Sequence, residues 1–146
     1  MKALHLPLFA IALGMVLSAN KCSGTSDMPT DAMAALKQGK WSLQTLHGKE
    51  PQLTADMQAP YIMLDSATGR LSGFGGCNKL VGTVKINGDS ISFPGLGSTK
   101  MYCEGREELE KGFMGALRSA SVFTLKDDRL TLLNADGELA VLAREK

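Results

Sequence analysis

The chain has 146 residues, of which 44% are hydrophobic and 21% are charged, and its formal net charge is +1. These values are typical of one globular domain with its own hydrophobic core. The near-neutral charge argues against a nucleic-acid-binding protein, because phosphate contacts need a surplus of Lys and Arg on one face.

The first residues have the layout of a secretory signal peptide. Lys2 is followed by an apolar run from Leu6 to Leu17, and the small residues Ser18 and Ala19 come next. The run is too short to span a bilayer comfortably. We therefore expect residues 1–21 to be a signal peptide and the protein to be exported, periplasmic or anchored to the outer membrane. A buried N-terminal helix is the alternative interpretation.

Cys22 directly follows this segment and resembles the acylated cysteine that begins a mature bacterial lipoprotein. Lipidation would also account for a cysteine left over from pairing. However, Ala19 and Lys21 stand where lipoprotein signals usually have a Leu-like and a small residue. Two hypotheses follow: lipidation at Cys22, which is the only membrane attachment that we expect, and ordinary cleavage near Ala19.

Residues 22–39 are predicted to be a polar tether with a short helix in "TDAMAALKQG", and residues 40–146 to be the folded domain. "KWSLQTLHG" predicts a strand with Trp41, Leu43 and Thr45 on one face. A polar loop containing Pro51 follows. "YIMLDSATGRLSGFGG" then predicts two strands that are joined at residues 67–69.

The clearest local signal is a β-hairpin in "NKLVGTVKINGDSISFPGL". Val84 and Ile86 precede Asn87-Gly88, and alternating apolar residues follow it. Asn-Gly supplies the positive φ angles that a tight hairpin turn requires.

One long segment, "CEGREELEKGFMGALRSA", has helical periodicity. Glu104, Glu107 and Glu108 are predicted in its first turn and Arg118 near its end, where their charges complement the helix dipole. The apolar residues recur on one face: Leu109, Phe113, Ala116, Leu117 and Ala120.

"VFTLKDDRLTLLNADGELAVLAR" predicts three more strands, with turns at residues 126–128 and 136–137. The expected fold is therefore mainly β (α+β), with about eight short strands and one helix inserted after the fifth strand. Sequential antiparallel pairing is the default topology for such a chain.

Cys77 and Cys103 remain in the domain. In an oxidising compartment such a pair is most simply a structural disulfide. It would close a loop of about 26 residues, which the chain-entropy model values on the order of 3 kcal/mol. Free structural thiols and a redox couple are the alternatives, although redox couples usually have C-x-x-C spacing near a helix start.

The same segments resemble the META domain, or HslJ-like heat-shock, family over nearly all of residues 40–146. The resemblance rests on "KWSLQTLHG", "GRLSGFGGCNKLVGTVKINGDSISF", "LGSTKMYC", "FMGALRSASVFTL" and "LTLLNADGELAVLAR". Tyr102 stands where many members have a small residue. The family motif falls on the following positions: Trp41, Gly48, Gly73, Cys77, Asn78, Gly82, Thr99, Met101 and Cys103.

This resemblance implies an antiparallel, barrel-like, lipocalin-like sheet with one packed helix. Members are commonly exported or lipid-anchored in bacteria and are linked to stress response and envelope robustness. The resemblance supplies no catalytic residues.

The glycines at 73, 75 and 76 would weaken a regular strand. We expect a sharp bend or a β-bulge there as the sheet closes, with the disulfide securing it. The alternative is a ligand loop, residues 73–79, lined by Phe74, Asn78 and Lys79.

No motif for catalysis or cofactor binding is found. "GFGGCN" lacks the last glycine of the dinucleotide fingerprint, and Ser98 and Lys100 are most simply neighbours in a polar loop. His47 is expected in a turn. Glu107, Glu108 and Glu110 are expected on a solvated helix face, and one histidine with two cysteines makes no convincing zinc site. We expect no cofactor and no metal.

The favoured function is that of a non-enzymatic envelope protein that acts in stress response through binding or structural support, with an unknown envelope protein or small ligand as partner. The alternative is a carrier of a small molecule or peptide that uses the barrel interior or residues 73–79. A hydrolase or thiol oxidoreductase lacks supporting residues. Large apolar residues favour a filled interior over a carrier cavity: Trp41, Ile62, Leu64, Val84, Ile91, Phe93, Phe123, Leu130, Leu132, Val141 and Leu142.

Overall fold

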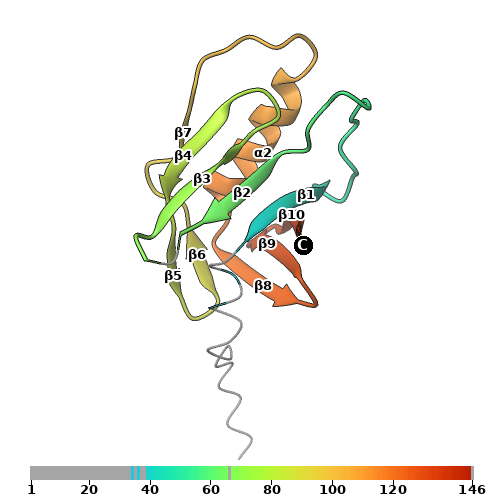
Figure 1. Cartoon of the computed structure of the whole chain (residues 1–146). Coiled ribbons are helices and arrows are strands. Elements are labelled where there is room, and N and C mark those ends of the chain that lie inside the picture. Colours follow the sequence, from blue (N-terminus) through green and yellow to red (C-terminus); the bar gives the residue numbers. More distant parts are fainter. Residues whose placement is uncertain (1–33, 35, 37–38, 66, 146) are drawn as a thin grey trace, which may run out of the picture.

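The structure is a computed structural model that describes residues 34, 36, 39–65 and 67–145 (Figure 1). The expected signal peptide, the candidate lipidation site Cys22, the cleavage site near Ala19 and most of the tether lie outside these residues. The described elements are β1 (Lys40–Leu46), β2 (Tyr61–Leu64), β3 (Arg70–Phe74), β4 (Lys79–Thr83), β5 (Lys85–Asn87), β6 (Ser90–Ser92), β7 (Gly97–Ser98), α2 (Glu107–Ser119), β8 (Val122–Lys126), β9 (Arg129–Asn134) and β10 (Gly137–Arg144).

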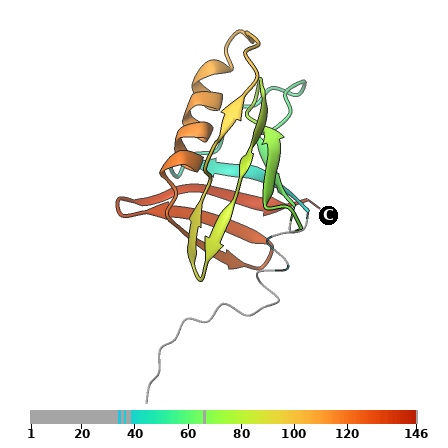
Figure 2. The ribbon, with the colours of Figure 1, turned by 90° about the vertical axis from the view of Figure 1, so that its left-hand side faces the viewer.

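All ten strands belong to one sheet with the order β5-β6-β8-β9-β10-β1-β2-β3-β4-β7, and every pairing is antiparallel. The two ends of this order, β5 and β7, belong to one long bent hairpin that runs from β4 to β7 (Figure 2). Its first half pairs with β3 and its second half with β8. The sheet therefore curls round on itself, and the predicted barrel-like, mainly β fold is confirmed.

The same bend explains why ten strands form where about eight were expected. The hairpin is interrupted at Val84 on one side and at residues 93–96 on the other, so each arm is divided into two short strands. Asn87 pairs with Ser90, and the two-residue turn is therefore Gly88-Asp89, one position later than expected. Gly88 has a positive φ of 60°. A two-residue hairpin turn with glycine at its first central position requires a positive φ at that residue.

Helix α2 covers one open side of the curled sheet and packs against β1, β9 and β10 (Figure 2). The predicted apolar stripe is confirmed, with Phe113, Ala116 and Leu117 buried. The predicted start is wrong: the helix begins at Glu107, so Glu104 precedes it. A turn with Gly105 at positive φ separates Glu104 from the helix.

Side chains fill the space inside the curled sheet. The residues predicted to fill it are buried, except that Val84 is only partly buried, and Val141 is buried outside the main cluster. Leu36 also lies in this core, and its carbonyl accepts a hydrogen bond of 3.0 Å from the indole Nε1 of Trp41. Packing against the domain therefore extends upstream of Lys40.

The buried face of β1 does not keep a period of two to Thr45. The pairing with β10 shifts register between Leu43 and Thr45. Beyond this irregularity the half-buried Leu46 packs against the core, because one extra residue turns the following side chains to the opposite face. The prediction that Thr45 shares the face of Trp41 is therefore wrong.

The glycine-rich segment forms β3, a tight turn over residues 75–78, and β4. A β-bulge was one of the two expectations here, and it is wrong, because both strand pairings of β3 continue without a register shift. Glycine is required at position 73 because β2 and β3 approach each other closely there. A Cβ at this position would lie 2.3 Å from the carbonyl oxygen of Tyr61. Gly76 supplies a φ of 115° in the turn, which L residues rarely adopt.

Candidate functional site

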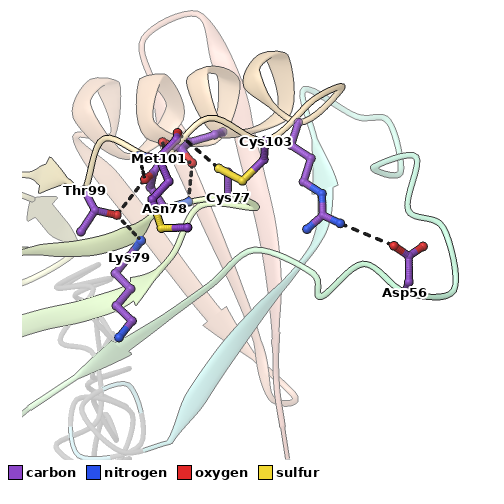
Figure 3. The surroundings of a disulfide bond; sticks show 9 residues. Asp56, Cys77, Asn78, Lys79, Thr99, Met101 and Cys103 are labelled. Carbon is purple, nitrogen blue, oxygen red and sulfur yellow. Dashed lines mark hydrogen bonds and ion pairs between the residues drawn. A yellow bond between two sulfur atoms is a disulfide. The ribbon is translucent and has the colours of Figure 1, made fainter.

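The turn between β3 and β4 is covalently joined to the segment that leads into α2. Cys77 and Cys103 form a disulfide, with their α-carbons 5.8 Å apart (Figure 3). Neither cysteine is a free thiol in this structure. The bond holds the loop of residues 99–106 against the end of the sheet.

Asn78, beside the disulfide, is the best-connected polar side chain described in this part of the molecule (Figure 3). It is only 6% exposed. Its Oδ1 accepts hydrogen bonds of 2.7 Å from the hydroxyl of Thr99 and of 2.7 Å from the N–H of Met101. Its Nδ2 donates to the carbonyl of Met101 at 3.1 Å and to Oε1 of Glu110 at 3.0 Å. Such a satisfied buried amide fixes the geometry of its neighbours.

Glu110 is the residue of this cluster that sequence reasoning missed. Its Oε2 accepts a hydrogen bond of 2.7 Å from the backbone N–H of Asn78, in addition to the contacts with the amide side chain. The prediction that Glu110 lies on a solvated helix face is wrong, because it is half-buried against the turn. The spacing of 32 residues carries no sequence signal for this pair.

The other two residues of the expected ligand loop, Phe74 and Lys79, differ in burial and in their contacts. Phe74 is half-buried and its ring lies 6.2 Å from that of Tyr61. Lys79 is exposed, and its N–H donates to the hydroxyl of Thr99 at 3.2 Å. The amide groups of Asn78 are already used within the protein. The ligand-loop hypothesis therefore loses the polar side chain that it relied on most.

Trp41, Gly48 and Gly82, three further family-motif positions, are explained by packing and backbone geometry. Trp41 is fully buried, and Gly48 adopts a φ of 73° in the turn after β1. A Cβ at Gly82 would lie 3.2 Å from the Cα of Leu96. His47, with a φ of 49°, is a turn residue as expected.

Beside the disulfide cluster lies a hollow of about 470 Å³ between β7 and α2. One wall comes from Gly97, Ser98, Lys100 and Met101, and the other from one face of α2. We call this hollow the β7–α2 groove. The residues on its helical wall are Glu107, Glu110, Lys111, Met114 and Arg118.

Two large apolar side chains are exposed on the loop that borders the groove. Met101 is 67% exposed and Tyr102 is 80% exposed. The side chain of Tyr102 therefore lies mostly in solvent. The backbone that carries them is fixed by the disulfide and by Asn78, so these side chains extend from a rigid base.

A second, larger hollow of about 870 Å³ lies over the outward face of β3 and β4. Val81, which is 60% exposed, is among its lining residues, together with Asp65, Arg70 and Ser72. The sheet beneath it is fully paired on both sides of β3. The β7–α2 groove, in contrast, borders the edge of the sheet, where the strand order ends at β7.

The carboxyl groups with shifted pKa values lie away from the groove. The hydroxyl of Thr68 and the backbone N–H groups of Ala67 and Thr68 lower the pKa of Asp65. The hydroxyl of Thr54 lowers the pKa of Asp56, and the hydroxyl of Ser42 lowers that of Glu145. These carboxylates stabilise turns and the chain end, and none has the raised pKa of a general acid.

Among the described residues, no group of three or more His, Cys, Asp or Glu side chains is placed to hold a metal ion. The helical segments that the structure describes include none that is both long and apolar enough for a membrane span.

Comparisons with known proteins address the family. The sequence matches the META domain over residues 34–146. A similar NMR structure has 25% identity and a TM-score of 0.59, with 74% of this chain and 91% of that chain covered. An NMR structure of a protein from Burkholderia xenovorans has 20% identity and a TM-score of 0.63, with 99% of both chains covered.

A crystal structure of a DUF4847 family protein from Bacteroides vulgatus has 15% identity and a TM-score of 0.55, with 77% of this chain and 96% of that chain covered. No functionally curated protein matches the sequence. The structural neighbours under 25% identity support the fold alone, whereas the family match extends over most of the chain. The chain therefore belongs to the META domain family.

Proposed function

We propose that the protein is an exported, non-enzymatic binding module of the bacterial cell envelope that supports envelope robustness under stress. The observation that carries this proposal is the contrast between a filled interior and a rigid, exposed loop. Because buried side chains fill the interior, a partner would contact the outer surface of the domain. There, Met101 and Tyr102 stand on a backbone that is fastened by a disulfide and by a buried amide.

Export is supported by the sequence of residues 1–21 and by the disulfide, since disulfides persist in oxidising compartments such as the periplasm. The stress role is what the resemblance to the HslJ-like heat-shock family implies. A non-enzymatic role fits the cluster around Asn78, whose amide groups are all engaged within the protein.

The carrier alternative is weaker, because the aromatic side chains of Trp41, Phe113 and Phe123 are completely buried in the interior that a ligand would occupy. Ligand sites for small molecules are usually preformed cavities of about 300–1,000 Å³. The two hollows described above lie outside this core.

The proposal is tested by photo-crosslinking in living cells under heat or envelope stress. A photoreactive amino acid replaces Tyr102 in one variant and Thr124, which is exposed on β8, in the control. We expect the probe at Tyr102 to capture one or a few defined envelope proteins, identified by mass spectrometry, and the control to capture far less. Recovery of the protein from the cytosol, or no partner at either position, would contradict the proposal.

The anchor is tested separately by the intact mass of the exported protein. Acylation at Cys22 adds the mass of the lipid, and the Cys22→Ala variant loses it. A mass that corresponds to cleavage near Ala19 would remove the anchor and leave export intact.

A further inference from the structure

Strand β7 is the last strand of the sheet order, so one of its sides is unpaired in the described sheet. Ser98 faces Leu80 on β4, and Thr99 donates its N–H to the carbonyl of Lys79 at 3.1 Å. Hydrogen-bonded and non-hydrogen-bonded pairs alternate along an antiparallel ladder. Ser98 is therefore in a non-hydrogen-bonded pair, and its own N–H and carbonyl point away from β4.

Ser98 lines the β7–α2 groove, and its two outward backbone groups lie on the side of β7 that pairs with no strand of the described sheet. Helix α2 lies alongside β7 (Figure 2). Glu107, Lys111, Met114 and Arg118 are spaced by three or four residues and so share one face of the helix, and all four line the groove. The groove thus has an unpaired strand edge on one side and a helix on the other. This is the arrangement that adds a peptide as an extra strand.

The charges of the groove favour an acidic occupant. Lys100, Lys111 and Arg118 are exposed and bring three positive charges. Glu107 is exposed and opposes them, whereas the carboxylate of Glu110 is engaged by Asn78. Neither Lys100 nor Lys111 forms a salt bridge within 4.0 Å with a carboxylate of the described residues.

The two walls are held in place before any ligand arrives. β7 is fixed by its pairing with β4, and the loop after it by the disulfide and by Asn78. Arg118 also donates from Nη2 to the carbonyl of Leu96 at 3.3 Å, which defines one end of the edge. A preformed site loses less conformational entropy when it binds.

We propose that the β7–α2 groove binds an extended, acidic peptide segment of a partner protein by β-strand addition. The peptide backbone pairs with the N–H and carbonyl of Ser98. Alternate side chains of the peptide face α2, where an apolar side chain contacts Met114 and a carboxylate lies near Lys111 or Arg118. This inference rests on the proposed function as a binding module and names the class of partner.

The first experiment selects ligands from a displayed library of random peptides with the full exported protein as bait. We expect enriched sequences that combine Asp or Glu with an apolar residue two positions away. A synthetic copy of the most enriched peptide is then added to isotope-labelled protein. The amide of Ser98 is expected to exchange with solvent at least tenfold more slowly once it is paired.

Variants separate backbone pairing from side-chain contacts. Ser98→Pro removes the outward N–H but no donor of the ladder with β4, and it should weaken binding of the synthetic peptide by about tenfold or more. Ser98→Ala keeps the backbone N–H and is the matched comparison. Lys111→Glu should weaken binding of the acidic peptide by about tenfold, whereas Lys126→Glu, at the exposed end of β8, should not.

Several outcomes overturn the inference. They are the absence of any selected peptide, peptide-induced shifts confined to another face, equal binding by Ser98→Pro and Ser98→Ala, and a dimer paired through β7 that excludes the peptide. If Ser98→Pro fails to fold, the Lys111→Glu and Lys126→Glu pair decides. A further outcome separates this inference from the proposed function. If the probe at Tyr102 captures a partner, and Lys111→Glu does not weaken the binding of that partner, the proposed function is retained and the peptide groove is rejected.

Discussion

Asn78 donates both its backbone N–H and its side-chain amide to the carboxylate of Glu110, at 2.7 Å and 3.0 Å. One residue ends the turn after β3 and the other lies in the first turn of α2, so this contact joins the sheet to the helix. The disulfide joins the same turn to the segment before the helix. The groove and its bordering loop depend on these two links.

The Asn78→Ala variant is expected to lose about 2–4 kcal/mol of unfolding free energy. The substitution leaves the carboxylate of Glu110 and the N–H of Met101 without their amide partner. Chemical denaturation measures the loss. Asn134→Ala, which removes turn contacts at the exposed end of β9, is the control and should cost less than about 1 kcal/mol. Equal losses in the two variants would show that the Asn78 cluster has no special role.

The Cys77→Ala, Cys103→Ala double variant should lose about 3 kcal/mol, because the disulfide restricts the unfolded chain between residues 26 positions apart. Thermal and chemical denaturation with and without reductant measure the effect. The unreduced protein should resist alkylation at both positions. Unchanged stability of the double variant would contradict the assigned structural role.

Gly73→Ala should be strongly destabilising, because the new Cβ would lie 2.3 Å from the carbonyl oxygen of Tyr61. A loss of about 2–4 kcal/mol or a failure to fold is expected. Gly115→Ala is the matched control, since a Cβ in the middle of α2 meets nothing within 4 Å. That variant should gain about 0.5–1 kcal/mol from helix propensity. Comparable effects of the same sign would contradict the close approach of β2 and β3.

Acid should weaken the turn between β2 and β3. The hydroxyl of Thr68 and two backbone N–H groups lower the pKa of Asp65 in the folded state from 3.8. The ionised group therefore stabilises the folded state fully above the unfolded pKa, and the contribution is lost as the pH falls through the lower folded value. An NMR titration should show that Thr68→Val raises the pKa of Asp65. Thr124→Val on β8 is the control and should leave this pKa where it is in the parent protein.

The sequence predicted the strands and the helix well where local signals were strong. The hairpin around Gly88 and the apolar stripe of Phe113 and Leu117 follow from turn chemistry and periodicity. Both are present in the structure. The register shift after Leu43 left no such signal, because a β-bulge adds one residue without any required residue type.

The sequence predicted some residues of the candidate site and missed others. Cys77, Asn78, Thr99 and Met101 were singled out by their motif, and they meet in one cluster. Glu110 was assigned to a solvated face, since an acidic run on a helix has that pattern whether or not one member contacts a distant turn. The edge position of β7 also depends on the strand order of the whole sheet, which two residues cannot reveal.

The claim that the loop bordering the groove is rigid is tested most directly by hydrogen exchange at the amide of Met101. This amide belongs to an exposed loop residue but donates to the buried Oδ1 of Asn78 at 2.7 Å. We predict that its protection approaches that of core strand amides and is lost in Asn78→Ala. Exchange of Met101 in the parent protein as fast as that of Gly105, in the same loop, would contradict the account.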